Sequence, residues 1–205
     1  RLLERSYRGY VTSGALLDAA QKAEVKRING ELAKLYTDFS RKVLADEETA
    51  IFLDSEADLA GLSDSFKASL ADEAKARGQA GKWAVKNTRS SMQPFLMYST
   101  RRDLREKVYN AYINRGDNGD ANDTNASIAA ILKLRQERAK VLGFKTHADY
   151  RMDDTMAETP ANAMKLMMSV WPAARARAIE EVADMQALAD AEAAAGKGPK
   201  ITIEG

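Results

Sequence analysis

The sequence predicts a mostly α-helical protein with two short extended segments. Three observations carry this prediction. Apolar residues recur at spacings of three and four over long stretches, which places them on one face of a helix. Residues that begin and end helices flank those stretches. Only two short runs, TAIFLDS (49–55) and GKWAVKN (81–87), have the character of strands.

The longest predicted helix in the first half covers about residues 18–45. Gly30 lies inside this helix, where it costs about 1 kcal/mol relative to alanine, so we expect a local weakness there. The apolar face of the helix consists of six residues at helical spacing: Val25, Ile28, Leu32, Leu35, Phe39 and Val43.

Two further helices are predicted in the middle of the chain. The first follows Ser63, its expected N-cap, and stops at Gly78. The second lies within residues 99–116 and ends at Gly116, with Thr100 and Asp103 as a variant of the capping box. Its apolar face is expected to contain Leu104, Val108, Ala111 and Tyr112.

The polar run RGDNGDANDTN, residues 115–125, is expected to join two antiparallel helices. Asp123, Thr124 and Asn125 can accept hydrogen bonds from the first turn of the following helix, which covers about residues 124–142 and stops at Gly143. We expect this helix to be buried on more than one side. One apolar face contains Ile128, Ile131, Leu132, Ala139 and Leu142, and an adjoining face contains Leu134 and Val141.

The last predicted helix begins at Thr159 and Pro160, an N-cap followed by proline at the first helical position. Pro172 should kink or restart it, and alanine-rich sequence then continues to Gly196. Five methionines crowd into this region beside Trp171. They are Met152, Met156, Met164, Met167 and Met168.

Composition excludes several classes of protein. The 31 basic and 30 acidic residues are interleaved, so the net charge is +1 and no basic stripe follows a phosphate backbone. Nucleic acid is therefore not an expected partner. No apolar run approaches the roughly 20 residues that cross a bilayer, and no membrane partner is expected. Cysteine is absent, which rules out disulfides and thiol catalysis.

The polar loop at 115–125 is rich in aspartate and asparagine oxygens, which are ligands that calcium prefers. A helix–loop–helix calcium site takes oxygen ligands at positions 1, 3 and 5, glycine at 6 and glutamate at 12. Counted from Asp120, position 6 is Asn125 and position 12 is Ile131; counted from Asp117, positions 3 and 5 are glycine and alanine. Both registers fail, so a connecting loop is favoured over a weak cation site. A calcium-responsive switch would require a calcium-dependent shift in melting temperature.

Other catalytic motifs also fail. Zinc sites draw mainly on histidine and cysteine, and the chain has one histidine, His147, and no cysteine, so it cannot contain HExxH. His147 is expected near the start of a short helix, partly exposed or hydrogen-bonded. Asp153 and Asp154 are adjacent and point to different sides of a helix, which offers no acid–base geometry.

The methionines admit two interpretations. Copper binding or a pliable groove for a partner helix would use them, but core packing at helical spacing is favoured. We therefore predict one helical domain over residues 1–205, with no catalytic, cofactor-binding or metal-binding residues of its own.

Several segments, in order and spacing, resemble a known family. The most specific are LREKVYNAY (104–112), RGDNGDANDTNASI (115–128), LRQERAKVLGF (134–144), ETPANAM (158–164) and WPAARARA (171–178). They resemble the amino-terminal helical portion of bacterial peptidyl-dipeptidases, also called dipeptidyl carboxypeptidases. These enzymes belong to the thimet oligopeptidase-like family of zinc metallopeptidases. The resemblance covers nearly the whole chain.

The resemblance implies a two-lobed, mostly α-helical enzyme around a narrow channel that excludes folded proteins. Such an enzyme removes dipeptides from the carboxyl ends of oligopeptides. Its zinc is held by the two histidines of an HExxH helix and a later glutamate, and the HExxH glutamate activates the attacking water. All of these residues are expected beyond Gly205. The tail at 196–205 leads toward that catalytic part of the parent enzyme.

By this resemblance the chain is the non-catalytic N-terminal helical lobe of a hydrolase, and it contributes channel wall and substrate-size restriction. Zinc is the cofactor of the parent enzyme, with none in this fragment. The implied partners are the oligopeptide substrate and the catalytic lobe of the same chain. The parent is expected to be a monomer in the cytoplasm, with the periplasm as the alternative location. The rival hypothesis is a stand-alone helical interaction module that grips a partner helix with its methionine-rich face.

The capping hypothesis for the polar loop gives a first prediction. If Asp123 caps the helix that follows, Asp123→Ala lowers the free energy of unfolding by about 1 kcal/mol. Thermal melting of the variant beside the unsubstituted chain measures this loss. Unchanged melting would mean that another residue provides the cap.

Overall fold

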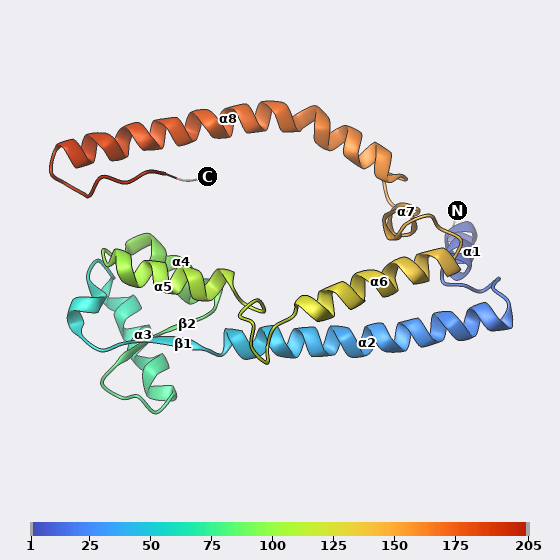
Figure 1. The fold of residues 1–205 in the computed structure, drawn as a ribbon, viewed down its shortest axis with the longest axis horizontal. Helices are drawn as coiled ribbons and strands as arrows, with labels where there is room; N and C mark the ends of the chain where they lie inside the picture. The colour runs from blue at the N-terminus through green and yellow to red at the C-terminus, as the bar shows by residue number, and fades with distance from the viewer. Residues whose placement is uncertain (1, 204–205) are drawn as a thin grey trace. The chain divides into compact units, whose positions relative to one another are not determined.

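The computed structural model describes residues 2–203, which form eight α-helices and two short β-strands (Figure 1). The prediction of a mostly α-helical fold with two extended segments is confirmed. The chain divides into two compact units, Arg1–Val141 and Leu142–Gly205, and each is described by itself. The single domain over residues 1–205 stays a prediction.

The first unit begins with α1 (Leu2–Thr12), which the sequence analysis did not predict, and α2 (Ala19–Glu47). Asp18 caps α2 through a capping box: its carboxylate accepts from the Gln21 backbone N–H at 2.8 Å, and the Gln21 side chain accepts from the Asp18 N–H at 3.1 Å. The predicted helix over 18–45 is thus confirmed. It runs without interruption through Gly30.

The second long helix of this unit, α6 (Asn125–Val141), lies antiparallel beside α2 (Figure 1). The two helices share a small apolar cluster formed by Ile28, Leu32, Ile131 and Leu134, with Leu35 and Tyr36 packed against it. Arg135 stacks on this cluster, because its Nε donates to the Tyr36 hydroxyl at 2.9 Å and its guanidinium lies 5.3 Å from the ring centroid.

The predicted burial of α6 on more than one side is wrong. Ile131 and Leu134 are buried, but Ile128 and Leu132 are 40% and 58% exposed. The physical reason is that α2 is the helix that packs along α6, and it covers only the stripe that includes Ile131 and Leu134. The covered stripe therefore takes Ile131 from one predicted face and Leu134 from the other.

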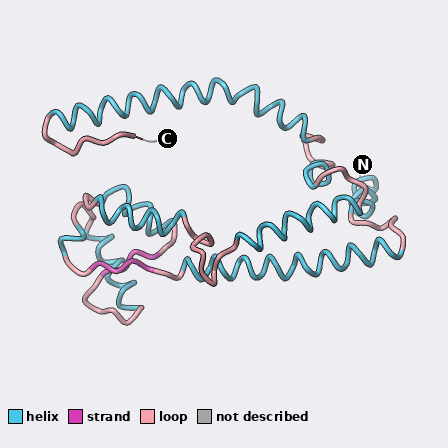
Figure 2. Tube along the Cα trace, viewed as in Figure 1, coloured by secondary structure: helices cyan, strands magenta, loops and turns pink. Residues whose placement is uncertain are grey.

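The strands β1 (Ala50–Leu53) and β2 (Trp83–Lys86) pair antiparallel, with Ala50 opposite Lys86 and Leu53 opposite Trp83 (Figure 2). Both extended segments were predicted. Around this strand pair lie the 3₁₀ helix η1 (Glu56–Leu59) and the helices α3 (Asp64–Ala76), α4 (Arg89–Tyr98) and α5 (Arg102–Ile113). Their shared core contains Leu53, Leu59, Leu62, Leu70, Val85, Phe95, Leu104 and Val108.

Ser63 caps α3 as predicted, accepting from the Phe66 N–H, although the contact is long at 3.4 Å. By contrast, α4 was not predicted. It carries Pro94 inside the helix, which is unfavourable to helix formation, yet its Phe95 side chain is fully buried in the core. Tertiary packing therefore outweighs local propensity here.

The predicted capping box of Thr100 and Asp103 is wrong. Helix α5 begins one residue later, with Arg101 in the N-cap position and no side-chain cap. The Thr100 N–H donates instead to the Ala60 carbonyl at 3.0 Å, and the Asp103 carboxylate binds the Arg101 guanidinium at 2.8 Å. The hydrogen bond from Arg101 lowers the pKa of Asp103. The physical reason is that Arg101, at the start of the helix, competes for the Asp103 carboxylate by offering it a charge-assisted hydrogen bond.

The second unit contains α7 (His147–Met152) and α8 (Pro160–Ala194). Thr146 and Thr159 cap these helices, accepting from the Asp149 N–H at 3.1 Å and the Asn162 N–H at 3.2 Å. The cap at Thr159 was predicted. Pro172 does not end α8, which continues through it as one helix and bends along its length (Figure 1).

After α8 the chain turns back along the same helix. The Gln186 side chain holds the returning segment with two hydrogen bonds: its amide donates to the Ile201 carbonyl at 3.0 Å, and its oxygen accepts from the Ile203 N–H at 2.8 Å. Within residues 2–203, no helix combines the length and the apolar character needed to cross a membrane.

The close packing of Gly61 gives a prediction. Its φ is +87°, and a Cβ at this position would lie 2.2 Å from the Tyr98 carbonyl oxygen. Gly61→Ala should therefore lower the free energy of unfolding by about 3 kcal/mol or more, through both clash and backbone strain. Urea denaturation measures the loss.

The matched control is Gly119→Ala. Gly119 has a similar φ of +66° but nothing within 4 Å of its Cβ position, so only the backbone strain of about 1 kcal/mol is expected. Equal losses in the two variants would show that contact with the end of α4 does not constrain Gly61.

Candidate functional site

The polar loop at 115–125 is organised around a buried carboxylate from a distant part of the chain. Asp46, in the last turn of α2, is only 4% exposed. Its Oδ2 accepts from the Gly116 N–H at 2.7 Å and the Asn118 side-chain amide at 3.0 Å, and its Oδ1 accepts from the Asn122 amide at 3.5 Å. Neutral N–H donors of the loop thus solvate this charge in place of water.

The loop also closes on itself near its two ends. The backbone N–H and the hydroxyl of Thr124 both donate to the Gly116 carbonyl, at 2.7 and 2.9 Å. Gly116 has a φ of +73°, and a Cβ there would lie 2.8 Å from the Thr124 hydroxyl oxygen. Glycine is therefore required at this position for conformation and for space.

Asp123 is placed to serve as the cap that the sequence suggested. Its Oδ1 accepts from the Asn125 N–H at 2.9 Å, at the first residue of α6, and its Oδ2 accepts from the Gly119 N–H at 3.2 Å. The Asp123 carbonyl accepts from the Lys42 ammonium of α2 at 2.9 Å. The Thr124 hydroxyl is instead turned toward Gly116, where it donates to the backbone carbonyl.

Charged residues tie the end of α2 to its neighbours. Arg115 binds Glu47 at 2.6 Å and stacks 4.1 Å above the Tyr112 ring. Glu48 accepts from the Lys86 ammonium at 2.9 Å, and this hydrogen bond is the main cause that lowers the pKa of Glu48. These contacts attach β2 and α5 to the last turn of α2.

Together, Asp46, Asn87 and the loop at 115–125 connect α2 to its neighbours, and we call this group of residues the joint. The Asp46 oxygens face N–H donors, and within the loop Asp117 accepts from the Asn125 amide at 2.6 Å and Asp120 from the Asn122 N–H at 2.7 Å. Within residues 2–203, no group of three or more histidine, cysteine, aspartate or glutamate residues is arranged to hold a metal ion. These described residues do not fit a zinc centre, which draws mainly on histidine and cysteine.

The other sequence-predicted residues lie in the second unit. His147 is the first residue of α7, as expected, with its ring 6.1 Å from that of Tyr150. Asp153 is the C-cap of α7. The predicted core packing of the methionines is wrong, because Met164, Met167 and Met168 are exposed along α8. The sequence identified an apolar stripe, but no other described helix of this unit covers it.

The exposed methionines line a groove on a single helix. It has a volume of about 550 Å³ and is lined by Met164, Leu166, Met167, Met168, Val170, Trp171 and Ala174. We call it the α8 groove.

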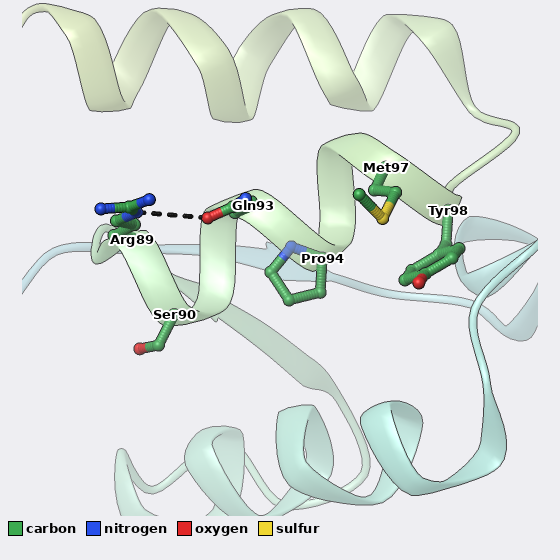
Figure 3. Close-up of a pocket in the computed structure, with 6 residues that line it drawn as sticks. All are labelled: Arg89, Ser90, Gln93, Pro94, Met97 and Tyr98. Carbon is green, nitrogen blue, oxygen red and sulfur yellow. Dashed lines mark hydrogen bonds between the residues drawn. The ribbon is translucent and has the colours of Figure 1, made fainter.

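Another groove lies on α4 and has a volume of about 620 Å³ (Figure 3). We call it the α4 groove. Ser90, Pro94 and Tyr98 lie along one side of the helix, and Arg89 Nε donates to Gln93 Oε1 at 3.2 Å. The groove offers an aromatic ring, apolar surface and a guanidinium. It contains no carboxylate or histidine for acid–base chemistry among its lining residues.

Two residues of the joint escaped the sequence analysis: Asp46 and Asn87. The Asn87 amide donates to the Asp46 carbonyl at 3.2 Å and the Ala111 carbonyl at 3.0 Å. The sequence contains one signal for Asp46: this charged residue occupies the next position in the helical spacing of the apolar residues Phe39 and Val43. For Asn87, at the end of a predicted strand, the sequence carries no comparable signal.

Fold and joint together define a helical scaffold whose buried polar side chains connect its elements. Comparison with known proteins extends this description. The family model described as Peptidase family M3 matches residues 95–201. Dipeptidyl carboxypeptidase of Escherichia coli (strain K12) is 36% identical over 191 residues, covering 93% of this chain and 28% of that protein.

Two further relatives agree. Dipeptidyl carboxypeptidase of Salmonella typhimurium is 33% identical over 193 residues, covering 94% of this chain and 28% of that protein. The probable cytosolic oligopeptidase A of Arabidopsis thaliana is 32% identical over 202 residues, covering 95% and 28%. The chain belongs to peptidase family M3, and it spans 28% of the length of these relatives.

The buried carboxylate of the joint gives a prediction. Asp46→Asn keeps the shape but turns an amide N–H toward a loop donor, so the free energy of unfolding should fall by about 2 to 3 kcal/mol. Chemical denaturation measures the loss.

Asp54→Asn is the control, because the Asp54 side chain is 73% exposed and makes a surface ion pair with Lys82. It should change stability by about 0.5 kcal/mol or less. Equal effects of the two substitutions would contradict the role given to Asp46.

Proposed function

We propose that the chain forms the non-catalytic helical portion of a zinc metallopeptidase that releases C-terminal dipeptides from oligopeptides. In this proposal it contributes channel wall and helps to restrict the size of the substrate. The observation that carries the proposal is the 36% identity to a dipeptidyl carboxypeptidase over 93% of this chain. The match to oligopeptidase A of Escherichia coli is weaker, at 28% identity, which favours the dipeptide-releasing branch.

The division of labour in this proposal has a physical basis. The buried polar residues of the joint hydrogen-bond to one another, and within residues 2–203 no group of three or more histidine, cysteine, aspartate or glutamate residues is arranged to hold a metal ion. We therefore assign the zinc ligands and the water-activating glutamate to the rest of the parent protein. There the metal would supply Lewis-acid activation of water. The residues of this chain would contribute shape and contact surface.

The α4 groove is the surface we propose as channel wall. Peptides are bound by apolar and aromatic side chains that supply contact area, with a few polar groups that set orientation. Tyr98 and Met97 provide the first kind of surface, and Arg89 and Gln93 provide the second. The groove is close to the start of the matched family segment at residue 95.

The proposed partners are an oligopeptide substrate and the catalytic lobe of the same chain, in a monomeric parent, with no nucleic acid and no membrane. We propose the cytoplasm as the location and keep the periplasm as the alternative. One plant relative is named as cytosolic and another as chloroplastic or mitochondrial, so relatives occupy more than one compartment.

The second candidate function is a stand-alone helical interaction module. The specific observation in its favour is the α8 groove, where Met167, Met168 and Trp171 are more than half exposed. Flexible methionines suit the binding of varied partner helices. Reading the source coding sequence past residue 205 separates the two candidates: an in-frame HExxH segment and a later glutamate support the peptidase, and a stop codon supports the module.

The activity itself is tested on the full-length parent with a pair of matched peptides. One hexapeptide has a free carboxyl end, and the other is identical but amidated. We expect mass spectrometry to show release of dipeptides from the free end only, with loss of activity in a zinc chelator and recovery on adding zinc. Internal cleavage of both peptides would replace this proposal with a general oligopeptidase, and chelator-resistant hydrolysis would overturn the assignment of zinc.

The contribution of this chain is tested in the same enzyme with Tyr98→Ala. Loss of an aromatic contact worth about 1 kcal/mol should raise KM about fivefold and leave kcat nearly unchanged. Tyr109→Ala on α5 is the control, because Tyr109 is similarly exposed, at 50%, but does not line the groove. Equal kinetics for both variants would remove the α4 groove from the channel wall.

A further inference from the structure

The side chain of Asn87 is fixed in one orientation. It is 8% exposed, and its amide nitrogen donates to the Asp46 carbonyl at 3.2 Å and the Ala111 carbonyl at 3.0 Å. Turning the amide over would place Oδ1 against these two carbonyl oxygens, where neither atom has a proton to share. The orientation with nitrogen toward the two carbonyls is therefore the one the surroundings allow.

This orientation leaves the other end of the amide unsatisfied by protein. Asn87 Oδ1 is buried, and no donor among residues 2–203 reaches it. A buried carbonyl-type oxygen without a hydrogen bond costs about 1 to 3 kcal/mol, and buried polar groups in folded proteins nearly always have a partner. A donor from outside these residues would remove this cost.

A small cavity adjoins this residue. Its volume is about 50 Å³, and it lies between the facing ends of the two strands and one turn of α5. Asn87, Thr49 and Lys86 are its polar residues, and Val85 and Val108 are among its apolar lining. A cavity needs about 10 to 15 Å³ of probe volume to hold one water molecule, so there is room for one or two.

We infer that this cavity is a binding site for an internal water molecule that donates a hydrogen bond to Asn87 Oδ1. Water fits the site because it supplies the missing proton and can accept a bond in return. A metal cation does not fit, because it would need several further oxygen ligands, whereas most of the wall is apolar. The site is independent of the proposed peptidase function.

The bound water would complete the joint around Asp46. Asn87 already connects the end of α2 to α5 through its nitrogen, and its backbone N–H donates to the Thr49 carbonyl at 3.0 Å beside the strand pair. Water on Oδ1 brings the oxygen end of this amide side chain into the same network. Helices α2 and α5 and the strand pair then meet at one hydrogen-bonded centre.

Water-selective NMR on the 205-residue chain tests the inference. We expect cross-peaks between the water resonance and the methyl groups of Val85 and Val108, with NOE and ROE of opposite sign, as a water resident for longer than the tumbling time produces. The absence of these cross-peaks, or the sign pattern of rapidly exchanging surface water, would overturn the proposal without any variant.

Two further measurements sharpen this test. Ala111→Val fills part of the cavity and should remove the cross-peaks while the remaining amide spectrum is preserved; persistence of the cross-peaks in a folded variant would place the water elsewhere and overturn the site. Replacing sodium and potassium by choline should leave the cross-peaks of the unsubstituted chain unchanged. A dependence on the small cations would mean that a cation occupies the cavity, which would also overturn the proposal.

Discussion

Burial of the Asp46 carboxylate is the constraint on which the first unit depends. A charge that is 4% exposed must have its hydration replaced by protein donors. The donors come from Gly116, Asn118 and Asn122, some 70 positions along the chain. To present them, the loop must turn tightly, which accounts for its glycines and asparagines. The end of α2 and the start of α6 are thereby held together, and the two helices run antiparallel from that point.

The same turn of α2 also connects the two apolar clusters. The Asp46 carbonyl accepts from the Thr49 hydroxyl at 2.7 Å and the Asn87 amide at 3.2 Å, where the strand pair begins. One cluster lies between α2 and α6, and the other lies around the strand pair and α3 to α5. Neither cluster is large. A polar centre between them fixes their connection through directional bonds that apolar contact alone does not provide.

The sequence predicted what local patterns encode. Apolar spacing predicted the long helix α2, and short runs of strand character predicted both strands. Residue type predicted the cap at Thr159. The mismatch with a calcium-binding loop predicted the connecting role of the polar loop. Helix α4 was not predictable in this way, because Pro94 opposes a helix and the burial of Phe95 that favours it depends on tertiary contacts. Asp46 as the partner of the loop was missed for the same reason, since the two are distant in sequence. The stripe on α8 was recognised as apolar, but periodicity does not reveal what covers a face.

The distribution of polar groups bears on what the chain can do within family M3. In the joint, the Asp46 carboxylate and the loop amides around it are bound to one another, so they make this part of the fold rigid. The α4 groove and the α8 groove are of a different kind, because they offer apolar and aromatic area with few charges. In the function that we propose, this contact area shapes and restricts the peptide, and the residues that activate water lie elsewhere in the parent protein.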